Sequence, residues 1–258
     1  MNKRVFAALA LCAAAVLLGG CSSSNYTWGW YIVSPFDARG SNNIQFLLSG
    51  IGFTISVALS AITISIVVGL LVALPALSRF RFLRGASRTY VELFRSVPML
   101  VMVLWVYYGL PVLLDVRLDA FAAGIIALAL CDSAFEAEIF RAGIQSIDHG
   151  QSEAADALGL GYVDKMRYVI LPQAIRRVLP PLGNQFVYML KASSLLSAIG
   201  LTELTRRATE LVVIEYRPLE IYTFLVVEYL VLILIVSWLV RRLERRMAAS
   251  DRLRVARA

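Results

Sequence analysis

Two acidic residues stand out within an otherwise apolar stretch of the sequence. Asp132 and Glu136 are four residues apart, inside a run that extends from Ala120 to about Phe140. On a helix this spacing places both side chains on one face, where two carboxylates repel unless a proton, a cation or a basic group intervenes. The residues therefore suggest two roles, an internal polar cluster with a basic partner such as Lys191, or the lining of a path for a cationic or zwitterionic solute.

Other charges in apolar surroundings favour structural roles. Glu138 and Arg141 are three residues apart near the end of the same run, a spacing that predicts an ion pair on one helix. Glu228 is the only charge between Ile221 and Val240. Because ionisable groups at membrane depth are costly, each is expected to be paired, neutralised or facing water.

Metal and redox chemistry is not supported by the residues available. The chain has one histidine, His149, and three cysteines, Cys12, Cys21 and Cys131, scattered along it. This set cannot form a His/Cys zinc site, a CxxC redox pair or a disulfide framework. We therefore expect no metal or cofactor to be bound by this chain.

The elements that position these residues are apolar. Of the 258 residues, 59% are hydrophobic and 17% are charged, whereas ordinary soluble domains are about 45–50% apolar. The composition excludes a soluble globule and a disordered chain, and predicts an all-α membrane protein with a five-helix core. The predicted membrane spans are Gly40–Ser78, Ser96–Leu114, Ala120 to about Phe140, Val178–Thr202 and Ile221–Val240.

The basic residues predict the orientation of these spans. They are concentrated in alternate connections, at Arg79, Arg81, Arg84 and Arg88, at Lys165, Arg167, Arg176 and Arg177, and at Arg241, Arg242, Arg245 and Arg246. Such connections face the cytoplasm, so the first span starts outside and the C-terminus is cytoplasmic. The net charge of +7 is thereby explained by membrane topology, and no nucleic-acid partner is expected.

The N-terminus carries a separate signal. A short apolar run, Val5–Gly20, follows two basic residues and ends at Cys21, which resembles a signal peptide with the lipobox of bacterial lipoproteins. The cysteine would then be lipidated after cleavage; an uncleaved extra helix is the alternative. The expected organisation is a signal-like segment over 1–21, an external linker over 22–43, a membrane domain over 44–246 and a basic tail over 247–258.

The longest inner connection, residues 145–179, has a pattern of its own. Asp148 can cap a short helix that Gly159 ends, and a second short helix is expected from Tyr162 to Leu171, before Pro172. A helix of small residues can approach another protein closely. The residues alone leave two interpretations open, a docking element or a surface link between two spans.

The pattern of this connection resembles a known family. Glu153, Ala154, Ala155, Gly159 and the Leu171-Pro172 pair match the EAA loop of permease subunits of bacterial ABC importers. The wider chain is similar to the branch that handles polar amino acids, over Tyr90–Pro98, Tyr107–Pro111, Glu138–Ile147, Leu171–Ala174 and Pro180–Asn184. Lys191–Leu195 resembles the Lys-Asp-Thr-Ser-Leu segment of that branch, and the match covers about residues 44–246.

This resemblance implies a transport subunit and not an enzyme. The EAA loop would be a coupling helix in a cleft of a cytoplasmic ABC ATPase dimer, with Glu153, Ala154, Ala155 and Gly159 in contact and Leu171 and Pro172 orienting the return to the membrane. The sequence contains no G-x-x-x-x-G-K-[ST] phosphate loop, so ATP would be used by that partner. The implied assembly also contains a second permease subunit, identical or homologous, an external substrate-binding protein and the lipid of the bacterial cytoplasmic membrane.

Asp132, Glu136 and Glu228 depart from the pattern expected of the family. They motivate a rival interpretation, an ion- or proton-conducting membrane protein in which these acids form the path. That interpretation does not account for the pattern from Glu153 to Pro172. A second rival, a membrane-anchored lipoprotein suggested by Cys21, does not account for five apolar spans.

Overall fold

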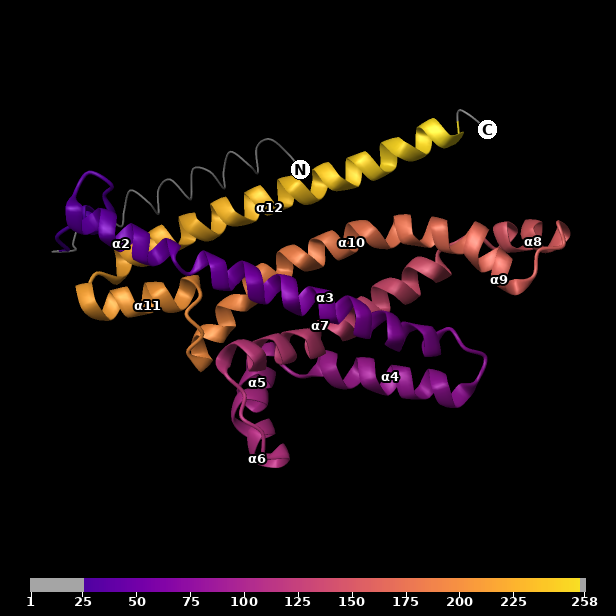
Figure 1. Ribbon diagram of the computed structural model, residues 1–258, viewed down its shortest axis with the longest axis horizontal. Coiled ribbons are helices and arrows are strands. Elements are labelled where there is room, and N and C mark those ends of the chain that lie inside the picture. The colour runs from indigo at the N-terminus through magenta and orange to yellow at the C-terminus, as the bar shows by residue number, and fades with distance from the viewer. Residues whose placement is uncertain (1–25, 256–258) are drawn as a thin grey trace, which may run out of the picture.

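The chain forms an elongated bundle of helices. The computed structural model describes residues 26–255, and the side chains of 26–245. Within this range the regular elements are helical, and the longest helices run side by side along the long axis (Figure 1). The predicted signal-like segment 1–21, with Cys21, lies outside the described residues, as does the start of the linker.

The helices follow one another with short connections. In chain order they are η1 (Trp30–Val33), α2 (Ala38–Leu48), α3 (Ile51–Ala76), α4 (Arg81–Ser96), α5 (Met99–Leu104), η2 (Trp105–Gly109), α6 (Leu110–Leu114), α7 (Ala120–Gln145), α8 (His149–Ala157), α9 (Tyr162–Lys165), η3 (Met166–Ile170), α10 (Leu171–Ala192), η4 (Ser193–Ile199), α11 (Leu204–Glu215) and α12 (Pro218–Val255).

Three of the predicted spans are long, apolar helices. By length and composition, Ala38–Ala76, Ala120–Gln145 and Pro218–Arg245 could each cross a membrane. The first is interrupted at Ser49 and Gly50, between α2 and α3. A Cβ atom at Gly50 would lie 2.6 Å from the backbone nitrogen of Leu204, so glycine permits the start of α11 to approach closely.

The second predicted span, Ser96–Leu114, is not a straight helix. Helix α4 and the segment Met99–Leu114 meet at an angle of 97° and could form a fourth, broken span only together. Pro98 disfavours the helical region for the residue before it, and Val97 is extended, with φ −87° and ψ 127°. Segment α5–α6 therefore projects sideways from the bundle (Figure 1).

The fourth predicted span corresponds to α10 and η4. Helix α10 does not meet the same apolar criterion among the described residues, because it carries Arg176, Arg177 and Lys191 as well as polar amides. The short helix expected from Tyr162 to Leu171 does not end before Pro172. A five-residue π-helical segment, η3, connects α9 directly to α10. Pro172 lies in the first turn of α10, where a missing N–H is tolerated.

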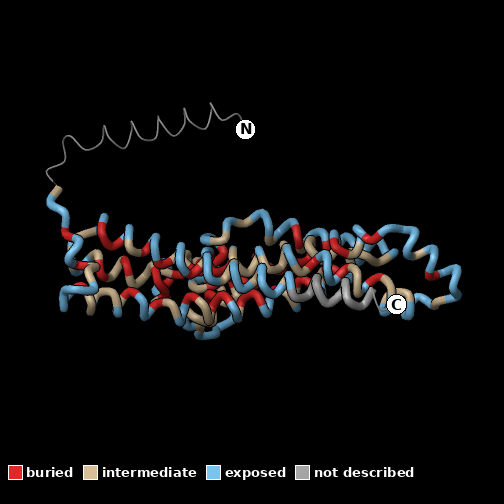
Figure 2. The backbone as a smooth tube through the Cα atoms, turned by 90° about the horizontal axis from the view of Figure 1, so that it is seen from above, coloured by how far each residue is buried: buried red, intermediate tan, exposed pale blue. Residues whose placement is uncertain are grey.

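The core lies between α3, α7 and α10. Helices α3 and α7 pack together along their length, and a cluster of buried apolar residues joins them to α5, η2 and η4. A second cluster joins η1, α2, α11 and α12. Buried positions extend along the whole bundle and exposed ones cover its outside (Figure 2), as expected for helices that bury one stripe each.

Candidate functional site

Helix α8 is held by specific interactions at both ends. The Asp148 side chain accepts a hydrogen bond of 2.7 Å from the backbone N–H of Gly150. At the other end, Leu160 N–H donates to the Ala155 carbonyl at 3.1 Å and Gly159 N–H to the Asp156 carbonyl at 3.0 Å. Gly159 has φ +72°, which completes a Schellman motif, the left-handed ending that favours glycine.

Side-chain contacts fix α8 relative to the helices that follow. Lys165 on α9 lies 2.8 Å from Asp156 Oδ1, and Gln173 on α10 donates to Gln151 Oε1 at 3.1 Å. Arg177 donates to the backbone carbonyl of Ser146 at the end of α7. The loop is therefore attached to both spans that it connects.

The residues matched to the EAA loop do not all face outward. Glu153, Ala154 and Gly159 are exposed, whereas Ala155 is only 2% exposed and faces the rest of the subunit. Leu171 is exposed and Pro172 half-buried in the first turn of α10. A partner can thus reach Glu153, Ala154 and Gly159 directly, while Ala155 sets the position of the helix.

Sequence reasoning missed the apolar part of this surface. Leu158, Tyr162 and Val163 are 80%, 74% and 72% exposed and follow or border the turn at Gly159. Large apolar side chains so exposed at the tip of a loop are typical of an interaction surface. The sequence feature that could have revealed this surface is the position of these apolar residues beside the glycines, in a loop otherwise rich in small and polar residues.

Asp132 is buried in the interface of three helices. Ser65 on α3 donates to Asp132 Oδ2 at 2.6 Å, and Gln185 on α10 donates to Oδ1. Both carboxylate oxygens are therefore satisfied by neutral donors. Lys191, the basic partner expected for this cluster, instead lines a hollow between α10 and α12.

Glu136 lies one turn further along α7 and is fully buried. Its carboxylate oxygens have no hydrogen-bond partner among the described residues. Gly69 of α3 packs against it, since a Cβ atom there would lie 2.5 Å from Glu136 Cβ. Glu228 on α12 is likewise 8% exposed and without a described partner.

Glu138 and Arg141 are joined on α7. Arg141 Nη2 lies 2.7 Å from Glu138 Oε2, and both side chains are 35% exposed. No group of acidic, histidine or cysteine residues in the described range could hold a metal ion.

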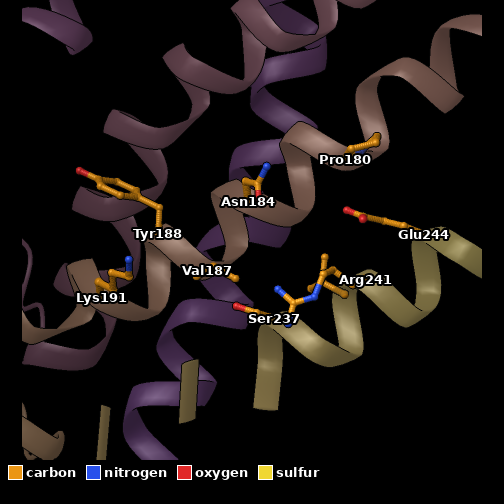
Figure 3. A pocket seen from close by; sticks show the side chains of 9 residues that line it. Pro180, Asn184, Val187, Tyr188, Lys191, Ser237, Arg241 and Glu244 are labelled. Carbon is orange, nitrogen blue, oxygen red and sulfur yellow. The ribbon is translucent and has the colours of Figure 1, made fainter. Parts of the chain in front are cut away.

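A polar hollow lies between α10 and α12, and sequence reasoning did not identify it. It has a volume of about 470 Å³. Asn184, Tyr188 and Lys191 line it from α10, and Arg241 and Glu244 from α12 (Figure 3). These residues are far apart in sequence, so only the packing of the two helices brings cations, a carboxylate and neutral donors together.

Comparisons with known proteins place the chain in a family. Residues 65–249 match the family of the binding-protein-dependent transport system inner membrane component. The glutamine transport system permease protein GlnP of Escherichia coli is 38% identical over 205 residues, 79% of this chain and 94% of that protein. The arginine transport system permease protein ArtQ of Bacillus subtilis is 35% identical over 208 residues, 81% and 95%.

A solved structure shows the same arrangement of helices. The crystal structure of an amino acid ABC transporter with histidines matches with a TM-score of 0.78 and 38% identity, covering 86% of this chain and all of that one. An inward-facing MetNI methionine ABC transporter, 20% identical with a TM-score of 0.67, shares the fold. The chain thus belongs to the inner membrane components of binding-protein-dependent transport systems and is a permease subunit of an ABC importer, not an enzyme.

Proposed function

We propose that this permease carries polar amino acids across the cytoplasmic membrane by alternating access, driven by ATP hydrolysis on a partner. The relatives named for glutamine and arginine support this substrate class, because their similarity covers about four fifths of the chain.

The α8–α9 turn is the proposed docking element for the ATPase dimer. Its support is a short helix with defined ends, side-chain attachments to α9 and α10, and an exposed apolar tip. Rigid attachment matters because a docking helix can transmit a movement only if it moves together with the spans. Glu153 and Ala154 would contact the ATPase beside Leu158 and Tyr162.

The proposed orientation places α8 and the C-terminal end of α12 in the cytoplasm. Both lie toward the same end of the molecule, and α2 and α11 lie toward the other (Figure 1). Arg241, Arg242 and Arg245 are then on the cytoplasmic side, in agreement with the positive-inside tendency. An external binding protein and a second permease subunit complete the proposed assembly.

The α10–α12 hollow is the proposed substrate surface. A zwitterionic amino acid presents a carboxylate and an ammonium group, and the lining offers Lys191 and Arg241 for the first and Glu244 for the second. Asp132 is assigned an internal structural role instead, because its oxygens are already occupied by Ser65 and Gln185. This proposal selects the internal polar cluster over the acid-lined path.

Uptake measurements test the proposal. The transporter, purified through a tag on this chain and reconstituted with its copurifying ATPase and the binding protein, should accumulate labelled glutamine, arginine or another polar amino acid only with ATP. Lys191→Gln should raise the KM for transport, whereas Arg242→Gln, which removes a charge from α12 outside the hollow, should not. Absence of uptake for every polar amino acid would overturn the substrate class, and an unchanged KM for Lys191→Gln would overturn the assignment of the hollow.

A further inference from the structure

A second hollow lies between α4 and the adjoining parts of α3 and α7. Its volume is about 480 Å³, and its charged lining consists of Arg84, Arg88, Glu92, Arg95, Glu138 and Arg141. The residues from α4 recur at three- and four-residue intervals, so they form one stripe along that helix. The hollow is distinct from the α10–α12 hollow and from the docking turn.

The lining has a surplus of positive charge. Four arginines face two glutamates, which gives a net charge of +2. Glu92 pairs with Arg88 at 2.7 Å and Glu138 with Arg141 at 2.7 Å. Arg84 contacts only backbone carbonyls of the preceding turn, at 3.1 and 3.4 Å, and Arg95 lies 5.0 Å from the ring centre of Phe135. Neither Arg84 nor Arg95 lies within ion-pair distance of a carboxylate among the described residues.

The walls of the hollow are fixed before any ligand arrives. Ser87 donates to the Val72 carbonyl at 2.7 Å and holds α4 against α3. Tyr90 and Ser133 share a hydrogen bond of 2.7 Å that holds α4 against α7. Because the helices that carry the arginines are held in place, binding of an anion does not have to order the helices themselves.

The hollow lies where the apolar helix α3 ends and the charged helix α4 begins. Ala76, the last residue of α3, is part of its wall, and the next residues lead into the arginine-rich start of α4. Phe80 and Phe82 are 61% and 84% exposed beside these arginines. Aromatic residues next to basic ones are typical of segments that lie in the headgroup layer of a membrane.

We propose that this hollow binds the phosphate group of an anionic phospholipid of the cytoplasmic leaflet. The arginines supply planar, charge-assisted donors that match phosphate oxygens, and Phe80 and Phe82 lie in the acyl-chain boundary. Basic pockets between membrane helices on the cytoplasmic side are suited to such headgroups. The choice of leaflet rests on the proposed orientation; the choice of ligand rests on the hollow.

Native mass spectrometry of the transporter, purified in detergent through a tag on this chain, tests the site with added phosphatidylglycerol. Arg84→Gln/Arg88→Gln should weaken retention of this lipid by about fivefold per charge removed. Arg79→Gln/Arg81→Gln removes the same charge from the same stretch outside the hollow and should retain the lipid as the unaltered protein does. Glu92→Gln should act in the opposite sense and strengthen retention, which a merely structural role of the stripe does not predict.

Two further binding measurements distinguish a phospholipid headgroup from free phosphate as the ligand. Phosphatidylcholine should bind more weakly than phosphatidylglycerol, and inorganic phosphate at millimolar concentration should not displace the anionic lipid. Equal effects of both double variants, displacement by free phosphate, or unchanged retention in Glu92→Gln would each overturn the assignment. Copurifying ATPase is measured in the same samples, so loss of lipid with the ATPase still bound leaves the proposed function intact.

Discussion

Replacement of Gly159 by threonine is the sharpest test of the α8–α9 turn as the proposed docking element. Gly159 has φ +72°, and a Cβ atom placed there would meet nothing within 4 Å. Within the subunit, a new side chain therefore acts through the backbone conformation and not through a steric clash. The substitution therefore tests the backbone conformation of the turn and not its packing against the subunit.

The size of the expected effect follows from the energetic cost of the left-handed conformation at residue 159. A residue with a Cβ atom pays about 1–2 kcal/mol there, and a β-branched residue more. The two hydrogen bonds that end α8, from Gly159 and Leu160, contribute about 0.5–1.5 kcal/mol each. The strain and the stabilisation are thus of similar size, so Gly159→Thr should open the turn in a large fraction of molecules. Asn tolerates this conformation, and Gly159→Asn should keep most of the function.

Gly161→Thr is the matched control. Gly161 also meets nothing within 4 Å, but it has φ −65° and ψ 163° at the N-cap of α9, where threonine is accepted. ATP-driven uptake and ATPase activity should be measured together in reconstituted vesicles. Gly159→Thr should lower uptake by about twofold, because a turn whose strain and stabilisation are equal is open in about half of the molecules, and membrane abundance should be unchanged.

Normal coupling in Gly159→Thr would refute the reasoning, because the turn would then not need its left-handed residue. Equal losses in Gly159→Thr and Gly161→Thr would also count against it. Such a result would mean that any side chain in this loop disturbs the partner, irrespective of backbone conformation.

Three other substitutions have expected outcomes. Asp132→Asn places an amide N–H against one of two existing donors and should lower membrane abundance through a loss of about 1–3 kcal/mol in folding free energy. Glu136→Gln removes a charge without a described partner and should leave membrane abundance unchanged. Reduced uptake per molecule in either variant would indicate that these residues line the transport path instead. Gly69→Ala should lower the Tm through about 1–3 kcal/mol of overpacking against α7, while Gly52→Ala, with open space on the same helix, should leave it unchanged or raised. If Cys21 is lipidated, intact-mass measurement should find a chain that lacks residues 1–20 and carries acyl groups, and Cys21→Ala should abolish both changes; an unmodified chain that begins at Met1 would support an extra helix.

The sequence predicted local features such as the long apolar helices well, and it predicted bends and continuations at prolines less well. The long apolar runs of α3, α7 and α12 appear as helices because burial and length are encoded residue by residue. The predicted span Ser96–Leu114 is bent away from α4 through the effect of Pro98 on Val97, and it could cross a membrane only together with α4. The short helix expected from Tyr162 to Leu171 continues past Pro172 into α10, because a π-helical segment before the proline accommodates it.

The sequence by itself determined the membrane class, the family pattern of the loop over residues 145–179 and the ends of α8, because Asp148 and Gly159 act on their immediate neighbours. Only the tertiary structure decided what surrounds Asp132, whose partners Ser65 and Gln185 are 67 and 53 residues away. The same is true of the two hollows, each lined from separate helices. Periodicity gives the apolar face of a helix, but the rotation and register with which helices pack depend on side-chain shapes along the whole interface.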